Sequence, residues 1–226
     1  GTVIGGRFYA ASPADPTILF FHGNGEIVAD YGDLASVYTR LGASFMPVDY
    51  RGYGISTGSP SVAAMMSDCH SVFEFAKEHL NAKGHSGPLL VMGRSLGSAS
   101  ALELASSYPG DVAALVIESG FAYILPLMRL LGIRADGLGI TEEGTFNHLE
   151  KIKGYAGPTL IIHAEHDHII PLSDGRALFA AAGSKNKRFL KIPGANHNNI
   201  FMFGAEEYIG AVAEILKRLD AGEKKG

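Results

Sequence analysis

Six short runs of apolar, β-branched and aromatic residues recur along this chain, and they constrain its fold more than any other feature. Most of these runs are continuous and do not alternate with polar residues. Strands that are buried on both faces of a parallel sheet have this pattern, because helices cover both sides of such a sheet. The sequence therefore predicts six strands of an open, mostly parallel sheet, over residues Thr17–Phe21, Ala43–Val48, Leu89–Met92, Ala113–Ile117, Thr159–His163 and Arg188–Ile192.

The segments between these runs have helical spacing. Ser61 follows Pro60 and is suited to cap a helix, and apolar residues then recur at helical spacing over Val62–Leu80. A last helix is predicted over Tyr208–Leu219. Alternating strands and helices imply right-handed crossovers with helices on both faces of the sheet. Val3–Ala10 alternates more and predicts an additional antiparallel edge strand, which brings the sheet to about seven strands.

One region is longer than a single crossover needs. Apolar residues that include Phe121, Ile124 and Met128 are followed by Arg134–Thr145, which is rich in glycine and acidic residues. We interpret residues 120–150 as a short helical lid over the carboxyl ends of the strands; the alternative is an ordinary crossover helix with a long loop. Residues 1–220, with this lid, form one predicted domain, and residues 221–226 form a charged tail that we expect to be disordered.

Composition excludes several classes of protein. The chain has 226 residues, 46% of them hydrophobic, which suits one domain with a sizeable core. A formal net charge of −4 gives no electrostatic reason to bind nucleic acid. Cys69 is the only cysteine, so an intrachain disulfide and a cysteine-based zinc site are both excluded. No signal peptide and no stretch of roughly 20 apolar residues is found, so we expect a cytoplasmic protein without stable membrane insertion.

The segment Gly93-Arg94-Ser95-Leu96-Gly97 contains the strongest chemical signal. An apolar run leads into this Gly-x-Ser-x-Gly pattern, and a run of small residues suited to a tightly packed helix follows it. A serine on a sharp strand-to-helix turn presents its hydroxyl above the sheet, and the flanking glycines relieve the crowding of the backbone. Ser95 is therefore a candidate nucleophile, although the bare pattern also arises by chance in glycine-rich chains.

A second strand ends in His22-Gly23-Asn24-Gly25-Glu26. Glycines on both sides of Asn24 let backbone N–H groups point at an anion. We expect the N–H groups of Asn24 and Leu96 to form an oxyanion hole, where one donor typically contributes about 3–4 kcal/mol in the transition state. The alternative is a phosphate-binding loop, but the full nucleotide-binding pattern is missing.

Two further strand ends carry an acid and a base. Asp167 follows the run that ends at His163, and His197 lies between the next run and the last helix. The chain order Ser95, Asp167, His197 is the order of triad members in one class of α/β enzymes. Glu118 is a rival acid, otherwise expected to support the nucleophile loop through hydrogen bonds. Asp49 is expected to hold a turn.

Histidines near Asp167 also allow a metal site. His163, His166 and His168 could bind a divalent ion together with Asp167. Alternate residues in a loop would point apart, however, so we expect no metal. His22 is expected to shape the oxyanion loop, and His70, His79, His85 and His148 are expected at the surface.

The chain from His22 to the C-terminal helix resembles the α/β-hydrolase superfamily of serine hydrolases. His22–Glu26 is similar to the oxyanion loop of monoglyceride-lipase-like members, and Asp49–Ser56 to the loop after the next strand in many members. Together with Gly93–Ser98, that loop most resembles members that remove palmitoyl groups from proteins. Asp167–Pro171 and Gly194–Asn199 match the acid and histidine loops. The sequence departs from the family in a short N-terminus and a small lid.

This resemblance implies an α/β-hydrolase fold and a serine hydrolase with Ser95, Asp167 and His197 as its triad. It implies a carboxylic ester or thioester as the small-molecule substrate, with no cofactor, and the small apolar lid favours a short to medium acyl chain. Phe121, Ile124 and Met128 are candidate substrate contacts. The alternatives are a peptidase or amidase of the same fold, or a non-catalytic protein that binds a small apolar ligand. The sequence does not indicate an oligomeric state.

Overall fold

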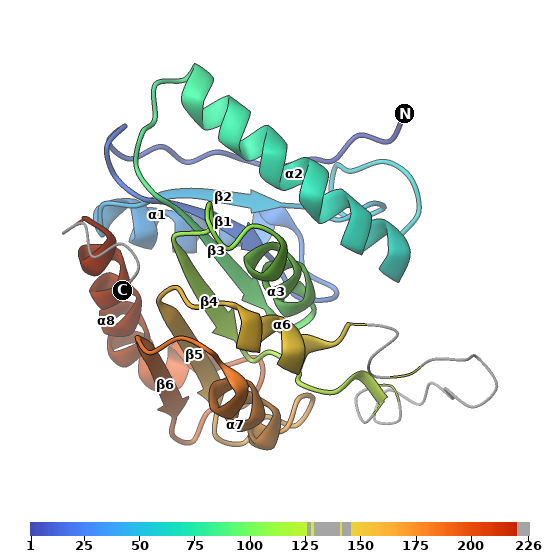
Figure 1. Ribbon diagram of the computed structural model, residues 1–226, viewed down its shortest axis with the longest axis vertical. Helices are drawn as coiled ribbons and strands as arrows, with labels where there is room; N and C mark the ends of the chain where they lie inside the picture. The colour runs from blue at the N-terminus through green and yellow to red at the C-terminus, as the bar shows by residue number, and fades with distance from the viewer. Residues whose placement is uncertain (126–127, 129–140, 142–145, 221–226) are drawn as a thin grey trace.

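A computed structural model describes residues 1–125, 128, 141 and 146–220 of the protein (Figure 1). Most of the predicted lid at 120–150 and all of the predicted tail at 221–226 lie outside these residues. Among the helices that are described, none is long and apolar enough to cross a lipid bilayer.

A six-stranded parallel sheet forms the centre of the molecule, with the strand order β2-β1-β3-β4-β5-β6. All six predicted runs are confirmed as strands, and the ends differ from the prediction by at most two residues. The largely apolar character of β1 to β5 follows from burial on both faces, whereas β6, at one edge of the sheet, is only partly buried. The strands are β1 (Thr17–Phe21), β2 (Ser44–Val48), β3 (Leu89–Arg94), β4 (Ala114–Glu118), β5 (Thr159–Ala164) and β6 (Lys187–Ile192).

The predicted seventh strand is not regular. The N-terminal segment runs antiparallel to β2 but contributes only isolated bridges, Gly6 to Val48 and Tyr9 to Phe45. Tyr9 and Phe45 exchange two backbone hydrogen bonds of 2.9 Å, whereas Arg7 only donates to the carbonyl of Pro47, at 3.1 Å. Because proline has no N–H, it cannot return the second bond, and the ladder is interrupted at this point.

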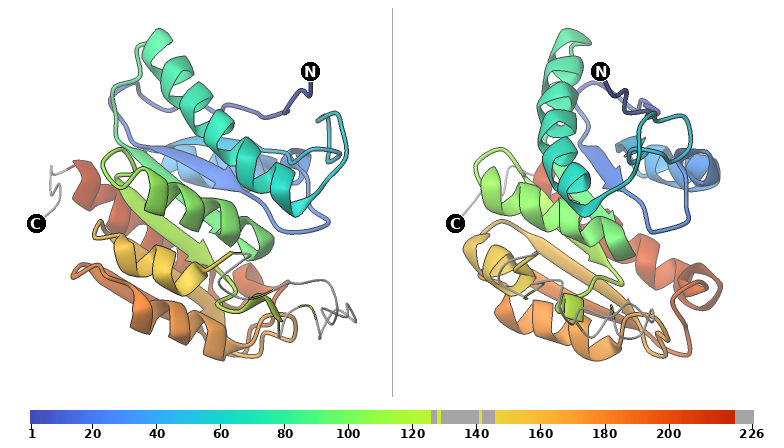
Figure 2. Two further views of the ribbon diagram at one scale, coloured as in Figure 1. Left: turned by 45° about the vertical axis from the view of Figure 1, so that its right-hand side comes forward. Right: turned by 90° about the vertical axis from the view of Figure 1, so that its right-hand side faces the viewer.

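Helices cover both faces of the sheet, as Figure 2 shows. The helices α2, α3, α6 and α7 pack on one face, and α1 and α8 on the other. Ser61 caps α2 as predicted, since its hydroxyl accepts a hydrogen bond from the N–H of Ala64 at 3.1 Å. The bounds are α1 (Gly32–Arg40), α2 (Val62–Ala82), α3 (Ser98–Ser107), α6 (His148–Gly154), α7 (Leu172–Ala181) and α8 (Ile200–Asp220), with short 3-10 turns η1 (Val28–Tyr31) and η2 (Ser95–Gly97).

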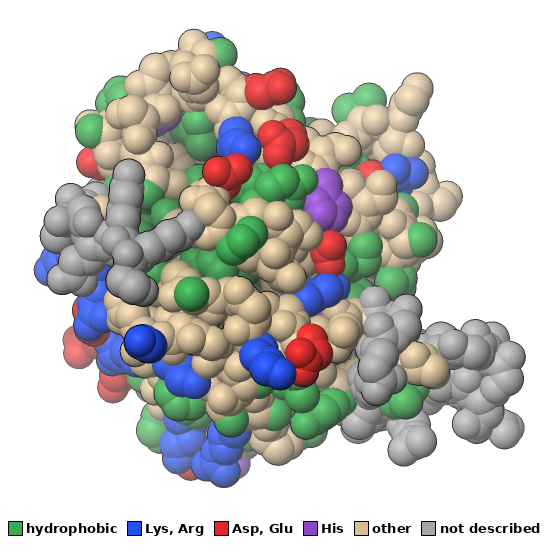
Figure 3. All heavy atoms as spheres, viewed as in Figure 1, with side chains coloured by type: hydrophobic (Ala, Val, Ile, Leu, Met, Phe, Trp, Pro, Cys, Tyr) green, Lys and Arg blue, Asp and Glu red, His purple; other side chains and the backbone are tan. Residues whose placement is uncertain are grey.

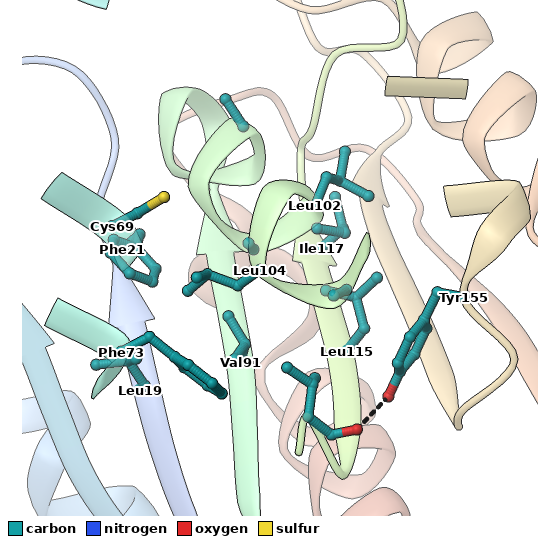
Figure 4. Packing of buried hydrophobic residues seen from close by; sticks show 14 of the residues in the cluster. Leu19, Phe21, Cys69, Phe73, Val91, Leu102, Leu104, Leu115, Ile117 and Tyr155 are labelled. Atoms are coloured by element: carbon teal, nitrogen blue, oxygen red, sulfur yellow. Dashed lines mark hydrogen bonds between the residues drawn. The ribbon is translucent and has the colours of Figure 1, made fainter. Parts of the chain in front are cut away.

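Successive residues of each strand enter two separate cores. In β1, Leu19 and Phe21 pack under α2 and α3, whereas Ile18 and Phe20 pack under α1 and α8. Figure 4 shows the first core, where the hydroxyl of Tyr155 donates a hydrogen bond of 3.0 Å to the carbonyl of Val112. This alternation buries both faces of the sheet. It also fixes the strand register, because a shift by one residue would move every side chain to the other core.

The outer edge of the sheet at β6 is protected by charge. Arg188 pairs with Glu214, and Lys191 pairs with Glu165. On the face drawn in Figure 3, Lys and Arg side chains are interspersed with Asp and Glu and gather toward the lower left. Charged side chains on an edge strand discourage pairing with the edge of another molecule.

Candidate active site

Ser95 lies at the sharp turn between β3 and η2. Its φ of 50° is in the left-handed region, which is unusual for a residue with a side chain. A Cβ on Gly93 would lie 2.3 Å from the carbonyl oxygen of Gly97, and a Cβ on Gly97 would lie 2.0 Å from that of Phe21. Neither position can hold a side chain, so the two glycines of the motif are required by the close packing of this turn.

The structure brings the three predicted triad residues into one chain of hydrogen bonds. The Nε2 atom of His197 lies 3.0 Å from the hydroxyl oxygen of Ser95. The Nδ1 atom of the same ring lies 2.7 Å from Oδ2 of Asp167. Ser95 and His197 are 9% and 5% exposed, so the chain is largely shielded from water. This is the geometry in which a histidine can take the proton of a serine hydroxyl.

The carboxylate of Asp167 is held on both sides. Its Oδ1 accepts hydrogen bonds from the backbone N–H groups of Ile169 and Ile170, at 3.0 and 2.8 Å. Burial by itself would raise the pKa of Asp167, but the hydrogen bonds from His197 and from these two N–H groups outweigh it, and the pKa lies below its usual value. Asp167 therefore stays ionised, which suits a residue that orients a histidine.

The loops that carry Asp167 and His197 are joined by further contacts. The N–H of His166 donates to the carbonyl of Ala195 at 2.8 Å. Glu165 pairs with Lys191 and accepts a hydrogen bond of 3.0 Å from the N–H of Gly194. Glu165 thus links the two loops through its contacts with the next strand and the loop after it.

His163 contacts the loop that carries Asp167. Its Nε2 lies 2.9 Å from the carbonyl oxygen of Ile170 and 3.7 Å from Oδ2 of Asp167. Burial lowers the pKa of His163, so the ring is neutral at physiological pH. Among the described residues, no three His, Cys, Asp or Glu side chains are placed to hold a metal ion.

Arg94, the variable residue before the nucleophile, was not predicted as part of the site. Its guanidinium donates to Glu26 at 2.9 Å, to Glu118 at 3.0 Å and to the backbone carbonyl of His197 at 3.1 Å. It thereby joins the loop after β1, the end of β4 and the histidine loop. The one available sequence signal is a charged residue at the end of an otherwise apolar strand.

Glu118 does not contact His197 through its side chain. One of its carboxylate oxygens accepts from Arg94, and the other accepts a 2.7 Å hydrogen bond from the hydroxyl of Tyr208. The Asp49 carboxylate accepts from the N–H of Val28 at 2.8 Å. Both acids thus anchor loops around the nucleophile, and Asp167 is the acid that meets the histidine.

Asn24 and Leu96 lie at neighbouring strand ends. The sheet pairs Phe21 at the end of β1 with Gly93 in β3, and Asn24 and Leu96 follow these positions closely. From β1 the chain continues to β2 on one side of the sheet and then crosses to β3 on the other side. Open α/β sheets bind their ligands at the carboxyl ends of two strands where the strand order reverses in this way. The loop is held by Glu26, which accepts from the N–H of Gly23 at 2.6 Å, and by Tyr53, whose hydroxyl donates to the amide oxygen of Asn24 at 2.5 Å.

The predicted substrate contacts lie at the start of the lid segment. Phe121 is 1% exposed and packs against the rings of Phe146 and His148. Ile124 and Met128 are partly buried. His148, expected at the surface, is 2% exposed because the rings of Phe121 and Phe146 pack against it. Its Nδ1 atom is hydrogen-bonded to the carbonyl of Phe121 at 2.7 Å and so connects the two ends of this segment.

Comparison with known proteins places these features in a family. Residues 12–139 match the family model described as serine aminopeptidase, S33. The chain is 30% identical over 210 residues to protein bem46 of Schizosaccharomyces pombe, covering 91% of this chain and 68% of that protein. It spans between 54% and 68% of the length of six curated relatives that it matches.

Solved structures of low sequence identity share the fold. Est1E from Butyrivibrio proteoclasticus with bound ferulic acid superposes with a TM-score of 0.81 at 18% identity, covering 98% of this chain and 97% of that one. A soluble variant of monoglyceride lipase from Saccharomyces cerevisiae, in complex with a substrate analog, gives a TM-score of 0.73 at 18% identity, covering 100% and 93%. Both confirm the predicted α/β-hydrolase fold.

Proposed function

The chain belongs to the serine aminopeptidase S33 family of α/β-hydrolases, and on that premise we propose that it is a serine hydrolase of carboxylic esters or thioesters with a short to medium acyl chain. The observation that carries this proposal is the chain of hydrogen bonds from Asp167 through His197 to Ser95. We assign residues 1–220 to one hydrolase domain.

Each residue has a distinct role in the proposed reaction. His197 takes the proton of Ser95 through Nε2 as the serine oxygen attacks the carbonyl carbon. The N–H groups of Asn24 and Leu96 stabilise the oxyanion, and Asp167 orients the imidazolium. His197 then donates its proton to the leaving group, which leaves an acyl-enzyme. Water activated by the same histidine hydrolyses this ester and frees Ser95.

An amide substrate is the second candidate, because the family model is described as a serine aminopeptidase. The monoglyceride lipase neighbour, solved with a substrate analog, favours an ester. A non-catalytic binding protein is the third alternative. Such a protein would not need the Ser95 hydroxyl to lie 3.0 Å from a histidine that is itself hydrogen-bonded to a buried acid.

A substrate panel separates these candidates. We expect turnover of p-nitrophenyl esters or acyl thioesters to exceed that of aminoacyl p-nitroanilides, and Ser95→Ala to abolish it. Activity should be greater at neutral than at acidic pH, because a histidine acts as a general base in its unprotonated form. Faster cleavage of the anilides would favour the peptidase, and absence of turnover on every substrate would favour the binding protein.

The proposed partner is the small-molecule substrate alone. With a net charge of −4 the chain has no general attraction to nucleic acid. The proposed location is the cytoplasm, and fractionation of cells that express the full-length protein tests it.

A further inference from the structure

A cavity of about 190 Å³ lies between the start of α2, the loop after β2 and η2, and Leu96, the residue after Ser95, lines it. Its wall includes Tyr50, Tyr53, Val62, Met65 and Leu96. These residues come from three separate segments, so the cavity is a product of the fold and is not recognisable as one motif.

Two of the wall residues connect the cavity to the proposed oxyanion hole. Leu96 directly follows Ser95, and its N–H is one of the two proposed donors. Tyr53 donates a hydrogen bond of 2.5 Å to the side chain of Asn24, whose N–H is the other. A carbonyl group held on Ser95 between these donors would therefore have the cavity next to it.

The chemistry of the wall indicates an uncharged, apolar occupant. Val62 is 49% exposed and Met65 is 8% exposed, and both contribute apolar side chains to the wall. The hydroxyl of Tyr50 is bound to the carbonyl of His22 at 2.7 Å, and that of Tyr53 to Asn24. Both tyrosines thus use their polar ends elsewhere, which leaves ring carbon for the cavity.

Arg51 is the charged residue of the wall, and its charge is already matched. Its Nε and Nη2 atoms donate to the two carboxylate oxygens of Asp68, at 2.5 and 2.6 Å. A forked pair of this kind is among the strongest ion pairs. An anionic group in the cavity would have to compete with Asp68, so the wall does not favour a charged ligand.

We propose that this cavity binds the acyl chain of the substrate, and that Val62 and Met65 limit the length of that chain. The proposal rests on the proposed function and adds the site that selects among acyl groups. A volume of about 190 Å³ holds roughly six groups the size of a water molecule, at ~30 Å³ each. This corresponds to an acyl chain of about six carbons.

The competing site is the start of the lid, with Phe121, Ile124 and Met128. Phe121 is 1% exposed and packed against two other rings. An acyl chain could reach it only after these rings move apart. The cavity at Val62 needs no such movement.

The test compares kcat/KM for p-nitrophenyl acetate, butyrate, hexanoate and octanoate in four variants. Val62→Trp fills the cavity, and we expect the ratio of hexanoate to acetate kcat/KM to fall at least tenfold, since one methylene in an apolar pocket changes kcat/KM by about 10- to 200-fold. Met65→Ala enlarges the cavity and should raise the ratio of octanoate to butyrate.

Two further variants are controls. Val3→Trp introduces the same side chain at a valine that is 60% exposed and lies outside the wall, and it should leave every ratio unchanged. Met128→Trp probes the lid. A profile that shifts with Met128→Trp but with neither Val62→Trp nor Met65→Ala overturns the assignment. If the unmodified protein hydrolyses no ester, including acetate, the proposed function itself fails and the acyl site fails with it.

Discussion

Replacement of Arg94 by methionine tests whether this residue holds the site together. Arg94→Met keeps most of the aliphatic stem and removes the guanidinium. Two carboxylates would then face each other without a cation, and the side chains of Glu118 and Glu26 are 4% and 25% exposed. Loss of one partner from a buried ion pair costs about 3–5 kcal/mol. Because water can reach Glu26, we expect a loss near the lower limit, about 3 kcal/mol in the free energy of unfolding.

The catalytic effect follows from the third contact. Arg94 is bound to the backbone carbonyl of His197 at 3.1 Å. A hydrogen bond from a charged donor is worth about 1.5–3 kcal/mol, which corresponds to a loss of about 10- to 160-fold in kcat/KM if the bond serves to hold the histidine in place. Arg94→Lys keeps the positive charge but loses the separate N–H donors of the guanidinium. Compared with Arg94→Met, it should therefore regain part of the stability and little of the activity.

Urea unfolding and ester hydrolysis measure both effects. The matched control is Arg188→Met, which breaks an ion pair with Glu214 whose side chains are 46% and 45% exposed; it should cost less than about 1 kcal/mol. Adding Glu118→Gln to Arg94→Met should restore part of the lost stability, because it removes an unpaired buried charge. The reasoning is refuted if Arg94→Met unfolds within 1 kcal/mol of the unmodified protein and keeps its kcat/KM.

Three further substitutions test separate parts of the account. Gly97→Ala would put a Cβ 2.0 Å from the carbonyl oxygen of Phe21 and should lower the melting temperature and the activity sharply. In the control Gly210→Ala no atom lies within 4 Å of the new Cβ, so the activity should be unchanged. Equal effects of the two substitutions would contradict the close packing of the turn at Gly97. Asp167→Asn should lower kcat by about 10³- to 10⁴-fold, since the histidine loses its orienting acid. It should also reduce the loss of stability in acid, because the depressed pKa of Asp167 contributes stability that is lost as the pH falls below about 4; an unchanged kcat would exclude Asp167 as the acid. Burial lowers the pKa of His148 to about 3, so the unfolded chain binds one more proton than the folded one between pH 6.5 and 3, and stability should rise with pH across this window by up to about 1.4 kcal/mol per unit. His148→Asn should remove that part of the slope in urea unfolding at pH 4 to 6.5, and an identical slope would argue against a buried neutral histidine.

The strands and the three triad residues could be predicted for the same physical reason. Strands covered on both faces must be apolar throughout, so their ends are visible in the sequence. Ser95, Asp167 and His197 each follow such a run, and parallel strands bring their carboxyl ends to one edge. Their chemistry and chain order then indicated that they would meet.

The side-chain contacts that surround the triad could not be predicted. Arg94 occupies the variable position of its motif. Glu118 is expected from the sequence to support the nucleophile loop, but nothing in the sequence indicates that it shares Arg94 with Glu26. His148 is polar and follows a loop, which is typical of a surface residue; only the packing of Phe121 and Phe146 around it produces burial. The prediction of a regular N-terminal strand was wrong. The alternation of Val3–Ala10 does not reveal that Pro47, on the partner strand, has no N–H to complete the ladder.

Covalent labelling of Ser95 tests the central claim most directly. A fluorophosphonate probe reacts with a serine that an adjacent histidine activates and an oxyanion hole serves. Mass spectrometry of the digested protein should locate one phosphonate on the peptide that contains Ser95, and Ser95→Ala should remain unlabelled. Stoichiometric labelling of Ser95→Ala, or labelling of the unmodified protein at another residue, would contradict the assignment of Ser95 as the nucleophile.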